Sequence, residues 1–360
     1  MEPTVKRILI RFPNWVGDAV MAEPIIGVFR KNYPQAQIAV VMREYSVKVL
    51  AGHPEVDRLI PCQDKSLEGF GKLVSEIKSY APDLVVILPN SLRTYASVRL
   101  AFIRNIVGYR RGIRKYLLKG PIAAKENGKY LPVPMTDYFL EICQWMGLSY
   151  DPKVIPQLYL TEAEVLKGDA LLQKYKIDPN DSLVTLNPGA QFGSSKCWPP
   201  EYFARLAEML HEKYQCKILI LVGPGEDNIA AKIVAASNVE MINIGPDKVD
   251  LGILKILIKR CDLLITNDTG PRHYAVAFDK PVVVLMGATD PRHTDCHLQK
   301  TVILREDIPC SPCHKKICPI DHPCMVNLIP EKVFSAVQKI NWQRGVNEPA
   351  SGSDYRRQAK

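Results

Sequence analysis

The stretch DLLITNDTGPRHYAVAFDKPVVVLMG, residues 262–287, decides the fold class of this chain. Its apolar runs at 262–266 and 281–286 are typical of β-strands, because both are short, rich in branched residues and bounded by turn residues. Between them, Asn-Asp-Thr-Gly predicts a tight turn that opens a helix. A strand, a helix and a second strand in this order predict a parallel sheet that helices cover on both faces.

The same alternation occurs along most of the 360 residues, and an apolar helix up to Tyr33 is expected near the start. Further strands are expected at 7–12, 38–42, 84–88, 183–187 and 217–222, and a further helix at 200–213. A loop-rich passage at 121–156 interrupts the pattern. At about 150 residues per domain, this length favours two domains. We predict Rossmann-like α/β domains at 1–165 and 180–328.

Two doubly wound domains are expected to face a central cleft, since open α/β sheets bind ligands at the carboxyl ends of their strands. A C-terminal helix is expected at 329–343, and the polar tail at 345–360 is expected to be disordered. This fold predicts room for two substrates, but it does not predict the chemistry. The sequence gives no indication of an oligomeric state.

Composition restricts the class of protein. Hydrophobic residues make up 47% and charged residues 24%, as in ordinary globular proteins. We see no apolar run of roughly 18 residues and no secretory signal over Met1–Arg11. We therefore expect a cytoplasmic protein in which the ten cysteines are reduced thiols or metal ligands.

The formal net charge of +9 is unevenly distributed. The segment from Leu84 to Lys125 contains no Asp or Glu. Such a basic field attracts nucleic acid, an anionic membrane surface or a phosphorylated acceptor, although a solvated basic face would look the same. Its basic residues include Arg93, Arg99, Arg104, Arg110, Arg111, Arg114, Lys115 and Lys119.

Asp18 is the first candidate for catalysis. It ends the sequence NWVGD at 14–18, between the first strand and the first helix. A carboxylate there is able to act as a general base if it is ionised and within reach of an acceptor hydroxyl. The alternative is a helix N-cap.

Asp268, Thr269, Gly270 and His273 form the second candidate, because a strand that ends in a Gly-containing turn offers backbone N–H groups and a helix dipole to a phosphate. A simple helix cap is the alternative, and Arg272 has no assigned role. The chain lacks the G-x-x-x-x-G-K-[ST] loop, and its first strand does not lead into G-x-G-x-x-G. Nucleoside triphosphatase and nicotinamide chemistry are therefore disfavoured.

Lys196 and Glu226 follow two other strands of the second domain. The lysine comes shortly after Asn187-Pro188-Gly189-Ala190 and could neutralise a leaving diphosphate. The glutamate lies in GPGED at 223–227 and could accept hydrogen bonds from ribose hydroxyls. Each alone is more often a turn lysine or a helix-start glutamate. However, all three motifs of this domain are expected at the same end of one sheet.

Four cysteines, Cys310, Cys313, Cys318 and Cys324, are spaced C-x2-C-x4-C-x5-C. This density fits a structural zinc or an iron–sulfur cluster, and it also fits reduced thiols packed in a tight loop. Any metal here is expected to be structural.

Five motifs, in order, carry a family resemblance: FPNWVGDAVM, ILPNSLRTYASVRL, LNPGAQFGSSKCWPPEYFARLAEML, VGPGEDNIAAKI and TNDTGPRHYAVAFDKPVVVLMG. Over about residues 7–340 the chain resembles the ADP-heptose:lipopolysaccharide heptosyltransferases of glycosyltransferase family 9. The WVGD and LPNS stretches are most similar to the branch that adds the second core heptose.

The resemblance implies a GT-B fold, with the acceptor on the N-terminal domain and the nucleotide-sugar on the C-terminal one. It implies that Asp18 is the catalytic base and that Lys196 assists catalysis at the donor diphosphate. It also implies inversion of configuration without a metal ion or other cofactor. The implied donor-binding residues are Glu226, Asp268, Thr269, Gly270 and His273, with Ser194 and Ser195 nearby.

The implied partners are an ADP-heptose donor and a lipopolysaccharide core and lipid A acceptor at the inner leaflet. The protein would then be cytoplasmic or peripheral at the inner membrane, and no nucleic acid is expected. The residues expected to meet the acceptor are Arg93, Arg110, Arg111, Arg114 and Lys115. Two rival functions remain open: a zinc-stabilised nucleic-acid-binding protein, and a non-catalytic or epimerase-like protein on the same scaffold.

Overall fold

The computed structural model describes residues 5–342, which divide into two compact units. The first unit extends to Tyr159 and also includes Arg292–Cys296. The second begins at Leu160 and contains the remaining residues. The predicted tail at 345–360 lies outside the described residues. No helix within 5–342 is long and apolar enough to span a membrane.

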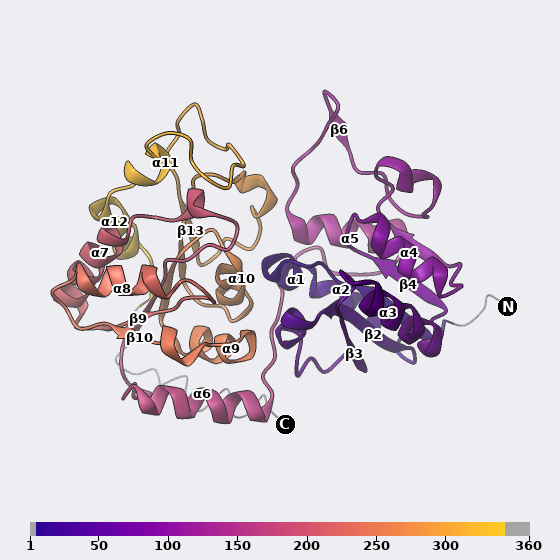
Figure 1. The fold of residues 1–360 in the computed structure, drawn as a ribbon, viewed down its shortest axis with the longest axis horizontal. Coiled ribbons are helices and arrows are strands. Elements are labelled where there is room, and N and C mark those ends of the chain that lie inside the picture. The colour runs from indigo at the N-terminus through magenta and orange to yellow at the C-terminus, as the bar shows by residue number, and fades with distance from the viewer. Residues whose placement is uncertain (1–4, 343–360) are drawn as a thin grey trace. The chain divides into compact units, whose positions relative to one another are not determined.

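The first unit is built on a five-stranded parallel sheet in the order β3-β2-β1-β4-β5 (Figure 1). The register pairs Ile8 of β1 with Ile38 of β2 on one side and with Leu84 of β4 on the other. The chain winds outward in both directions from β1, so the sheet is doubly wound. The strands are β1 (Arg7–Arg11), β2 (Gln37–Arg43), β3 (Arg58–Cys62), β4 (Leu84–Ile87) and β5 (Ile106–Gly108).

Helices cover both faces of this sheet. The helices α3 (Leu67–Tyr80) and α4 (Leu92–Leu100) bury one apolar face, and Ser66 caps α3 by accepting a hydrogen bond from Gly69 N–H at 3.0 Å. The helices α1, α2 and α5 pack together separately. Their bounds are α1 (Val16–Ala22), α2 (Pro24–Asn32) and α5 (Met135–Trp145).

The single helix expected up to Tyr33 is wrong. The structure ends α1 at Ala22 and begins α2 at Pro24. Proline has no backbone N–H and is favoured in the first turn of a helix, so it starts α2 instead of continuing α1. A short antiparallel hairpin, β6 (Lys125–Glu126) with β7 (Lys129–Tyr130), lies within the loop-rich passage.

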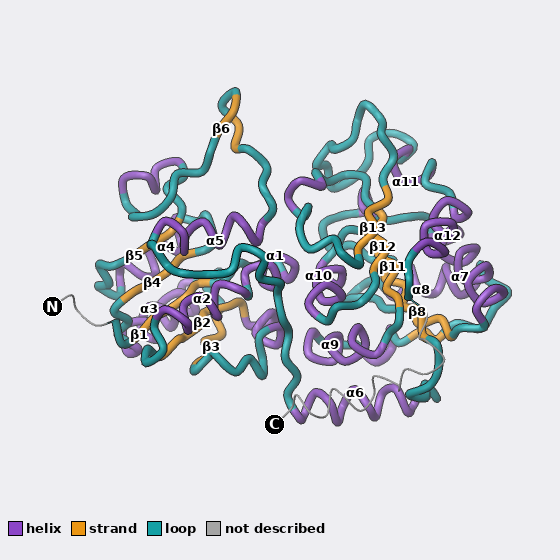
Figure 2. Tube along the Cα trace, turned by 180° about the vertical axis from the view of Figure 1, so that it is seen from behind, coloured by secondary structure: helices purple, strands orange, loops and turns teal. Residues whose placement is uncertain are grey.

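The second unit has a six-stranded parallel sheet in the order β10-β9-β8-β11-β12-β13 (Figure 2). The apolar runs correctly predicted β8, β9, β11 and β12, whereas the short strands β10 and β13 were not predicted. Together the two sheets confirm the predicted α/β fold with two doubly wound units. The strands are β8 (Leu183–Asn187), β9 (Lys217–Ile220), β10 (Ile242–Asn243), β11 (Leu263–Asn267), β12 (Val282–Leu285) and β13 (Thr301–Leu304).

Helices α7 and α12 pack together over one face of this sheet, whose core includes Leu186, Ile220 and Ile265. The bounds are α7 (Pro200–Tyr214), α8 (Asp227–Ala235), α9 (Leu251–Arg260), α10 (Gly270–Ala277), α11 (Pro323–Val326) and α12 (Pro330–Lys339). The helix expected at 329–343 therefore corresponds to α12.

Helix α6 (Glu162–Lys174) belongs to the second unit, although the predicted domains end at 165 and resume at 180. Its capping box uses Thr161 and Glu164, and Glu164 also pairs with the buried Lys255 Nζ of α9 at 2.9 Å. Gly168 packs so closely on Ile256 that a Cβ there would lie 2.4 Å from that side chain. These contacts fix α6 on α9.

Candidate active site

The carboxyl ends of β8 and β11 form the centre of the site in the second unit. These strands are neighbours, and Asn187 at the end of β8 is in register with Thr266. The Asn187 amide donates to the hydroxyls of Thr266 and Thr269, both at 2.9 Å. The Asn267 amide donates back to the carbonyl of Pro188 at 2.6 Å. Two turns that are distant in sequence are thereby tied together.

Lys196 and Asp268 form an ion pair at this edge. The lysine lies in a short 3-10 turn, Ser194–Lys196, and its Nζ donates to the Asp268 carboxylate and to the Asp268 carbonyl, both at 2.8 Å. The lysine side chain is 13% exposed and the aspartate 9%. The sequence predicted both residues for the site, and the structure brings them into direct contact.

Arg272 has a partner that the sequence did not reveal. Its Nη1 donates to Asp268 at 2.9 Å, and the hydroxyl of Thr289 donates to the same carboxylate at 2.5 Å. Burial acts to raise the pKa of Asp268, but the charges of Lys196 and Arg272 outweigh it and bring that pKa well below its ordinary value. Two cations and one carboxylate leave one positive charge among these three side chains.

The first turn of α10 lies next to this cluster. Thr269 precedes the helix but makes no side-chain cap, and its hydroxyl instead accepts the Asn187 amide. The simple cap considered as an alternative is therefore not observed. Burial lowers the pKa of His273 to about 3, with the charge of Arg272 acting in the same direction. His273 is accordingly a neutral imidazole near pH 7.

Glu226 is held by two glycines at neighbouring strand ends. The backbone N–H of Gly223 donates to Glu226 Oε2 at 2.7 Å. A Cβ on Gly189 would lie 1.8 Å from the same oxygen, so only glycine leaves room for this carboxylate. Glu226 makes no side-chain cap to α8. The carboxylate is thus fixed beside the β8 turn.

Asp18 lies in the first turn of α1, whose N-cap residue is Trp15, so Asp18 is not the N-cap. The preceding turn is held through Asn14, whose Oδ1 accepts bonds from Arg11 Nη2 at 3.1 Å and from Arg43 Nε at 3.2 Å. Asp64 in turn pairs with Arg43 at 2.6 Å.

Sequence reasoning missed the residues that hold this turn, Arg11, Arg43 and Asp64. The available signal in the sequence was a charged residue, Arg11, at the end of the apolar run that forms β1. In the structure Arg11 is only 2% exposed. Buried charged groups are generally paired, so such a residue indicates a local network.

The basic segment contains one cation that is almost fully buried. Arg114 is 2% exposed, and its Nη1 donates to Pro89 O at 2.9 Å and to Asn90 Oδ1 at 3.1 Å. Its neighbour Arg111 lies over the Tyr130 ring at 3.6 Å and donates to the Tyr138 hydroxyl at 3.4 Å. Within the described residues neither arginine pairs with a carboxylate. Burial lowers the pKa of Arg114.

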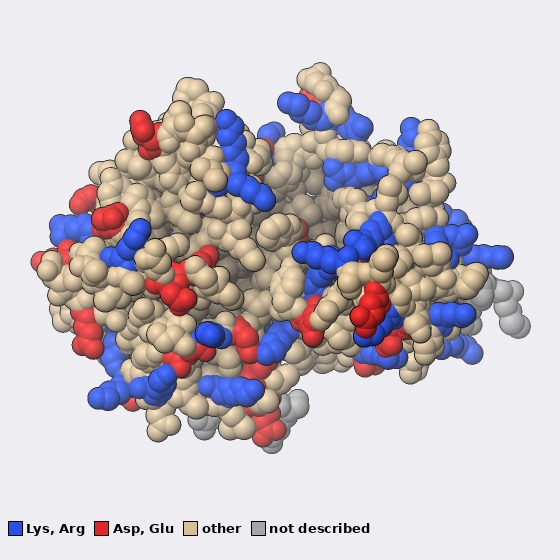
Figure 3. Space-filling model, viewed as in Figure 1, with Lys and Arg blue, Asp and Glu red and all other residues tan. Residues whose placement is uncertain are grey.

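A cavity of about 610 Å³ lies beside these arginines. Figure 3 shows Lys and Arg side chains gathered on this unit. The lining of the cavity is basic and apolar. It consists of Arg110, Gly112, Ile113, Lys115, Tyr116, Ile122, Ala123, Ala124, Lys125 and Tyr130. Arg110 Nε donates to Lys115 O at 3.1 Å.

Arg93 lies outside the lining of this cavity. It is on α4, and its Nη2 donates to Lys65 O at 3.0 Å. The five residues predicted for the acceptor therefore include two that line the cavity (Arg110 and Lys115), two that flank it (Arg111 and Arg114) and one elsewhere on the unit.

The four clustered cysteines line a separate cavity of about 50 Å³ together with Ser195 and His322. No three His, Cys, Asp or Glu side chains in the described part of the chain are grouped so that they could hold a metal ion. The metal that the spacing of these thiols suggested is therefore not confirmed. Ser194 is exposed, whereas Ser195 is buried and donates its hydroxyl to Lys315 O.

Comparison with known proteins gives consistent matches. The family model of glycosyltransferase family 9 (heptosyltransferase) matches residues 70–323. Lipooligosaccharide heptosyltransferase 2 of Haemophilus influenzae is 30% identical over 83% of this chain and 88% of that protein. Lipopolysaccharide heptosyltransferase 2 of Salmonella typhimurium is 28% identical over 94% of this chain and 100% of that protein.

The same comparison with solved structures supports the fold. The structure of E. coli ADP-heptose lps heptosyltransferase II superimposes with a TM-score of 0.75, covering 92% of this chain and 97% of that one. Its sequence identity is 24%, so this likeness concerns the fold alone.

Proposed function

Because the chain belongs to glycosyltransferase family 9 (heptosyltransferase), we propose that it transfers a heptose from ADP-heptose to the inner core of lipopolysaccharide. Relatives named lipopolysaccharide or lipooligosaccharide heptosyltransferase 2 match most of its length, which supports this donor and this acceptor. Family membership makes the chain a glycosyltransferase, and neither the nucleic-acid-binding nor the epimerase-like alternative is favoured.

The observation that carries the proposal is the Lys196–Asp268–Arg272 cluster beside the first turn of α10. The site offers a net positive charge and helix N–H groups at the carboxyl edge of a parallel sheet, which suits a diphosphate. In our proposal, Lys196 and the N–H groups near Thr269 and Gly270 stabilise the charge that develops on the departing ADP.

The remaining donor contacts follow from the chemistry of ADP-heptose. We assign Glu226 to the ribose hydroxyls, because a fixed carboxylate accepts two such hydrogen bonds. Asp268 and the neutral His273 are assigned to donor binding at the cluster. Ser194 is assigned to donor binding as well.

Asp18 is the proposed general base. It would take the proton from the acceptor hydroxyl, which attacks the anomeric carbon from the face opposite ADP and inverts its configuration. In this displacement Asp18 takes the proton. Lys196 and the N–H groups near Thr269 and Gly270 stabilise the charge on the departing ADP. The structural metal at the cysteines stays a prediction that metal analysis of the purified protein can test.

For the acceptor we propose the basic cavity of the first unit and its neighbouring arginines. Arg111 lacks a carboxylate partner in the described chain, so an anionic ligand would compensate its charge. Arg114 is buried and holds Pro89 and Asn90 behind this surface. Phosphates and acidic sugars of a lipopolysaccharide core have this chemistry. The exposed Ile113, Tyr116 and Ile122 beside these cations fit a peripheral position at an anionic inner leaflet.

The direct test is incubation of the purified protein with ADP-heptose and defined truncated core acceptors, with product mass as the readout. We expect one heptose to be added to an acceptor that already carries the first core heptose. Asp18→Asn should abolish this transfer while ADP binding, measured by calorimetry, persists. Transfer by Asp18→Asn at the wild-type rate would contradict the assignment of the base.

The rival functions give different results in the same experiment. A nucleic-acid-binding protein would retain nucleic-acid affinity and show no binding of ADP-sugar. A non-catalytic relative would bind ADP-heptose and yield no product with any acceptor.

A further inference from the structure

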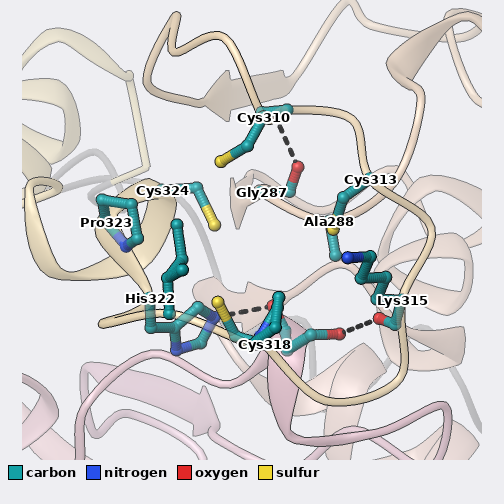
Figure 4. Close-up of a pocket in the computed structure, with 13 residues that line it drawn as sticks. Gly287, Ala288, Cys310, Cys313, Lys315, Cys318, His322, Pro323 and Cys324 are labelled. Carbon is teal, nitrogen blue, oxygen red and sulfur yellow. Dashed lines mark hydrogen bonds between the residues drawn. The ribbon is translucent and has the colours of Figure 1, made fainter.

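Residues 310–324, which we name the cysteine loop, supply most of the lining of the small cavity that Ser195 also lines. Figure 4 shows Cys310, Cys318 and Cys324 of this loop around the cavity. The Ser195 backbone N–H donates to Lys316 O at 3.1 Å, and the Ser195 hydroxyl donates to Lys315 O. The carbonyl of Ser195 accepts a bond from His322 Nε2 at 2.8 Å. The backbone donor, the side chain and the backbone acceptor of one buried residue are therefore all bonded to the same loop.

The loop also lies directly on the backbone next to Ser195. Gly193 has a φ of +152°, and a Cβ there would lie 2.2 Å from the carbonyl oxygen of Lys316. Only glycine allows this approach. The cysteine loop therefore fixes the turn that carries Lys196 both by hydrogen bonds to Ser195 and by close contact at Gly193.

A second set of bonds ties the cysteine loop to the end of β12. The backbone N–H of His314 donates to Ala288 O at 2.8 Å, and the hydroxyl of Ser311 donates to Gly287 O at 2.7 Å. The next residue, Thr289, donates to the Asp268 carboxylate. The loop thus holds Ser195, which directly precedes Lys196. It also holds Ala288, which directly precedes Thr289, the residue that donates to Asp268.

We propose that the cysteine loop positions Lys196 for the donor diphosphate, with Ser195 and His322 as positioning residues. This inference rests on the proposed function, because it needs Lys196 to meet the donor. A lysine has a flexible stem of four carbons, so a fixed backbone on its N-terminal side reduces the number of positions its ammonium can take. Preorganised charges stabilise a developing negative charge without reorganising during the reaction.

This role differs from the one expected for Ser195. Its hydroxyl is directed at Lys315 O and is buried, so it supports Lys196 instead of bonding phosphate. The four thiols line the same small cavity as Ser195, Gly287 and Ala288, and they therefore shape the loop at both anchor points. A Cβ on Gly287 would lie 2.6 Å from Cys324 Sγ, which shows how closely sulfur packs there.

The test is a double-mutant cycle on the full-length protein, with the dissociation constant of ADP measured by calorimetry. His322→Ala should weaken ADP binding about tenfold, the scale of a displaced charged hydrogen bond. In a Lys196→Ala background the same change should alter ADP binding less than about twofold, because the route through the lysine is gone. Equal losses in both backgrounds would overturn the proposal, as would no loss in either.

Matched variants separate positioning from folding. His211 also bonds a backbone carbonyl, Cys216 O at 3.1 Å, and His211→Ala should leave ADP affinity unchanged. His322→Gln keeps an N–H donor and should recover most of the affinity. If His322→Ala fails to fold, Ser195→Ala enters the same cycle, since it removes only the hydroxyl bond to Lys315 O.

Failure of this inference is distinguishable from failure of the proposed function. A wild-type protein that neither binds ADP nor transfers heptose would refute the function and, with it, the role of Lys196. A wild-type protein that does both, with loop variants that bind ADP as tightly as it does, would refute the positioning role alone.

Discussion

The two basic regions of this chain handle positive charge in opposite ways. In the second unit, Lys196 and Arg272 share the buried carboxylate of Asp268. In the first unit, Arg111 and Arg114 contact an aromatic ring, a hydroxyl, a backbone carbonyl and a side-chain amide oxygen, without a carboxylate among the described residues. A paired cluster is a rigid, preformed site, whereas cations without a counter-ion are stabilised further when an anion binds. The difference teaches that charge pairing, more than charge count, separates a donor site from an acceptor surface.

The largest expected effect comes from removing the shared carboxylate. Asp268→Asn removes the buried carboxylate that pairs with both Lys196 and Arg272, so the free energy of unfolding should fall by about 3–5 kcal/mol. Denaturant unfolding measures the loss. The control is Asp247→Asn, which breaks a more exposed pair with Lys174 and should cost at most about 1 kcal/mol. Equal losses of the free energy of unfolding would mean that the buried cluster depends on charge pairing no more than the exposed Lys174–Asp247 pair does.

Lys196→Ala should have the next largest effect. The variant keeps the Arg272–Asp268 pair, so we expect a folded protein whose turnover number falls about 100- to 1000-fold, as for loss of one transition-state donor. Steady-state transfer assays measure it. Lys174→Ala removes an equally paired but exposed lysine, and it should transfer at the wild-type rate. Wild-type turnover by Lys196→Ala would mean that groups other than Lys196 stabilise the departing diphosphate.

The first unit should respond through the acceptor. Arg111→Ala should raise the KM for the acceptor about tenfold and leave the KM for ADP-heptose unchanged, because a charged hydrogen bond to phosphate is lost. Arg58 is an exposed arginine of the same unit that is paired with Glu76, so Arg58→Ala is the matched control and should change neither constant. Parallel changes in both Michaelis constants would argue against separate donor and acceptor regions.

Per pH unit, the smallest expected effect is on the pH dependence of the free energy of unfolding. The pKa of His273 is lowered to about 3 in the folded protein, while an unfolded histidine titrates near about 6.5. Between these values the unfolded state binds the extra proton, so stability is full above about pH 6.5 and is lost as pH falls toward 3. His273→Asn should flatten this slope by less than about 1.4 kcal/mol per pH unit.

The wild-type protein is the reference for that titration. Denaturant unfolding of both proteins at pH 7, 6 and 5 gives the two slopes. An unchanged slope in His273→Asn would show that burial beside the cluster does not control the charge of His273.

Apolar periodicity was sufficient to predict the fold, because parallel strands buried on both faces leave continuous runs such as Leu183–Asn187. The resemblance to the heptosyltransferase family was confirmed by the family match. The split between α1 and α2 was missed, although Pro24 was the available signal. Short edge strands such as β10, with two residues, are too brief to give a periodic pattern.

The sequence predicted which turns lie together at one edge of the second sheet, but not how their side chains are connected. Motif positions correctly placed the turns of Lys196 and Asp268 at one edge of the sheet. The pair of Arg272 with Asp268 was missed although the two residues are only four positions apart. Lys196 and Thr289 join the same carboxylate from positions that are distant in sequence, which no local pattern reveals. Burial also changed one expectation, since Arg114 holds Pro89 and Asn90 and is nearly inaccessible to solvent.

The composition of the first unit has a practical consequence for dissecting this enzyme. Arg292–Cys296 belong to that unit although they follow β12 in the chain, and Cys296 Sγ lies 3.9 Å from the Thr136 hydroxyl. A fragment that stops at Tyr159 would lack this segment and expose the surface it covers. Separate expression of the halves therefore requires a circularly permuted or grafted design, not a single truncation.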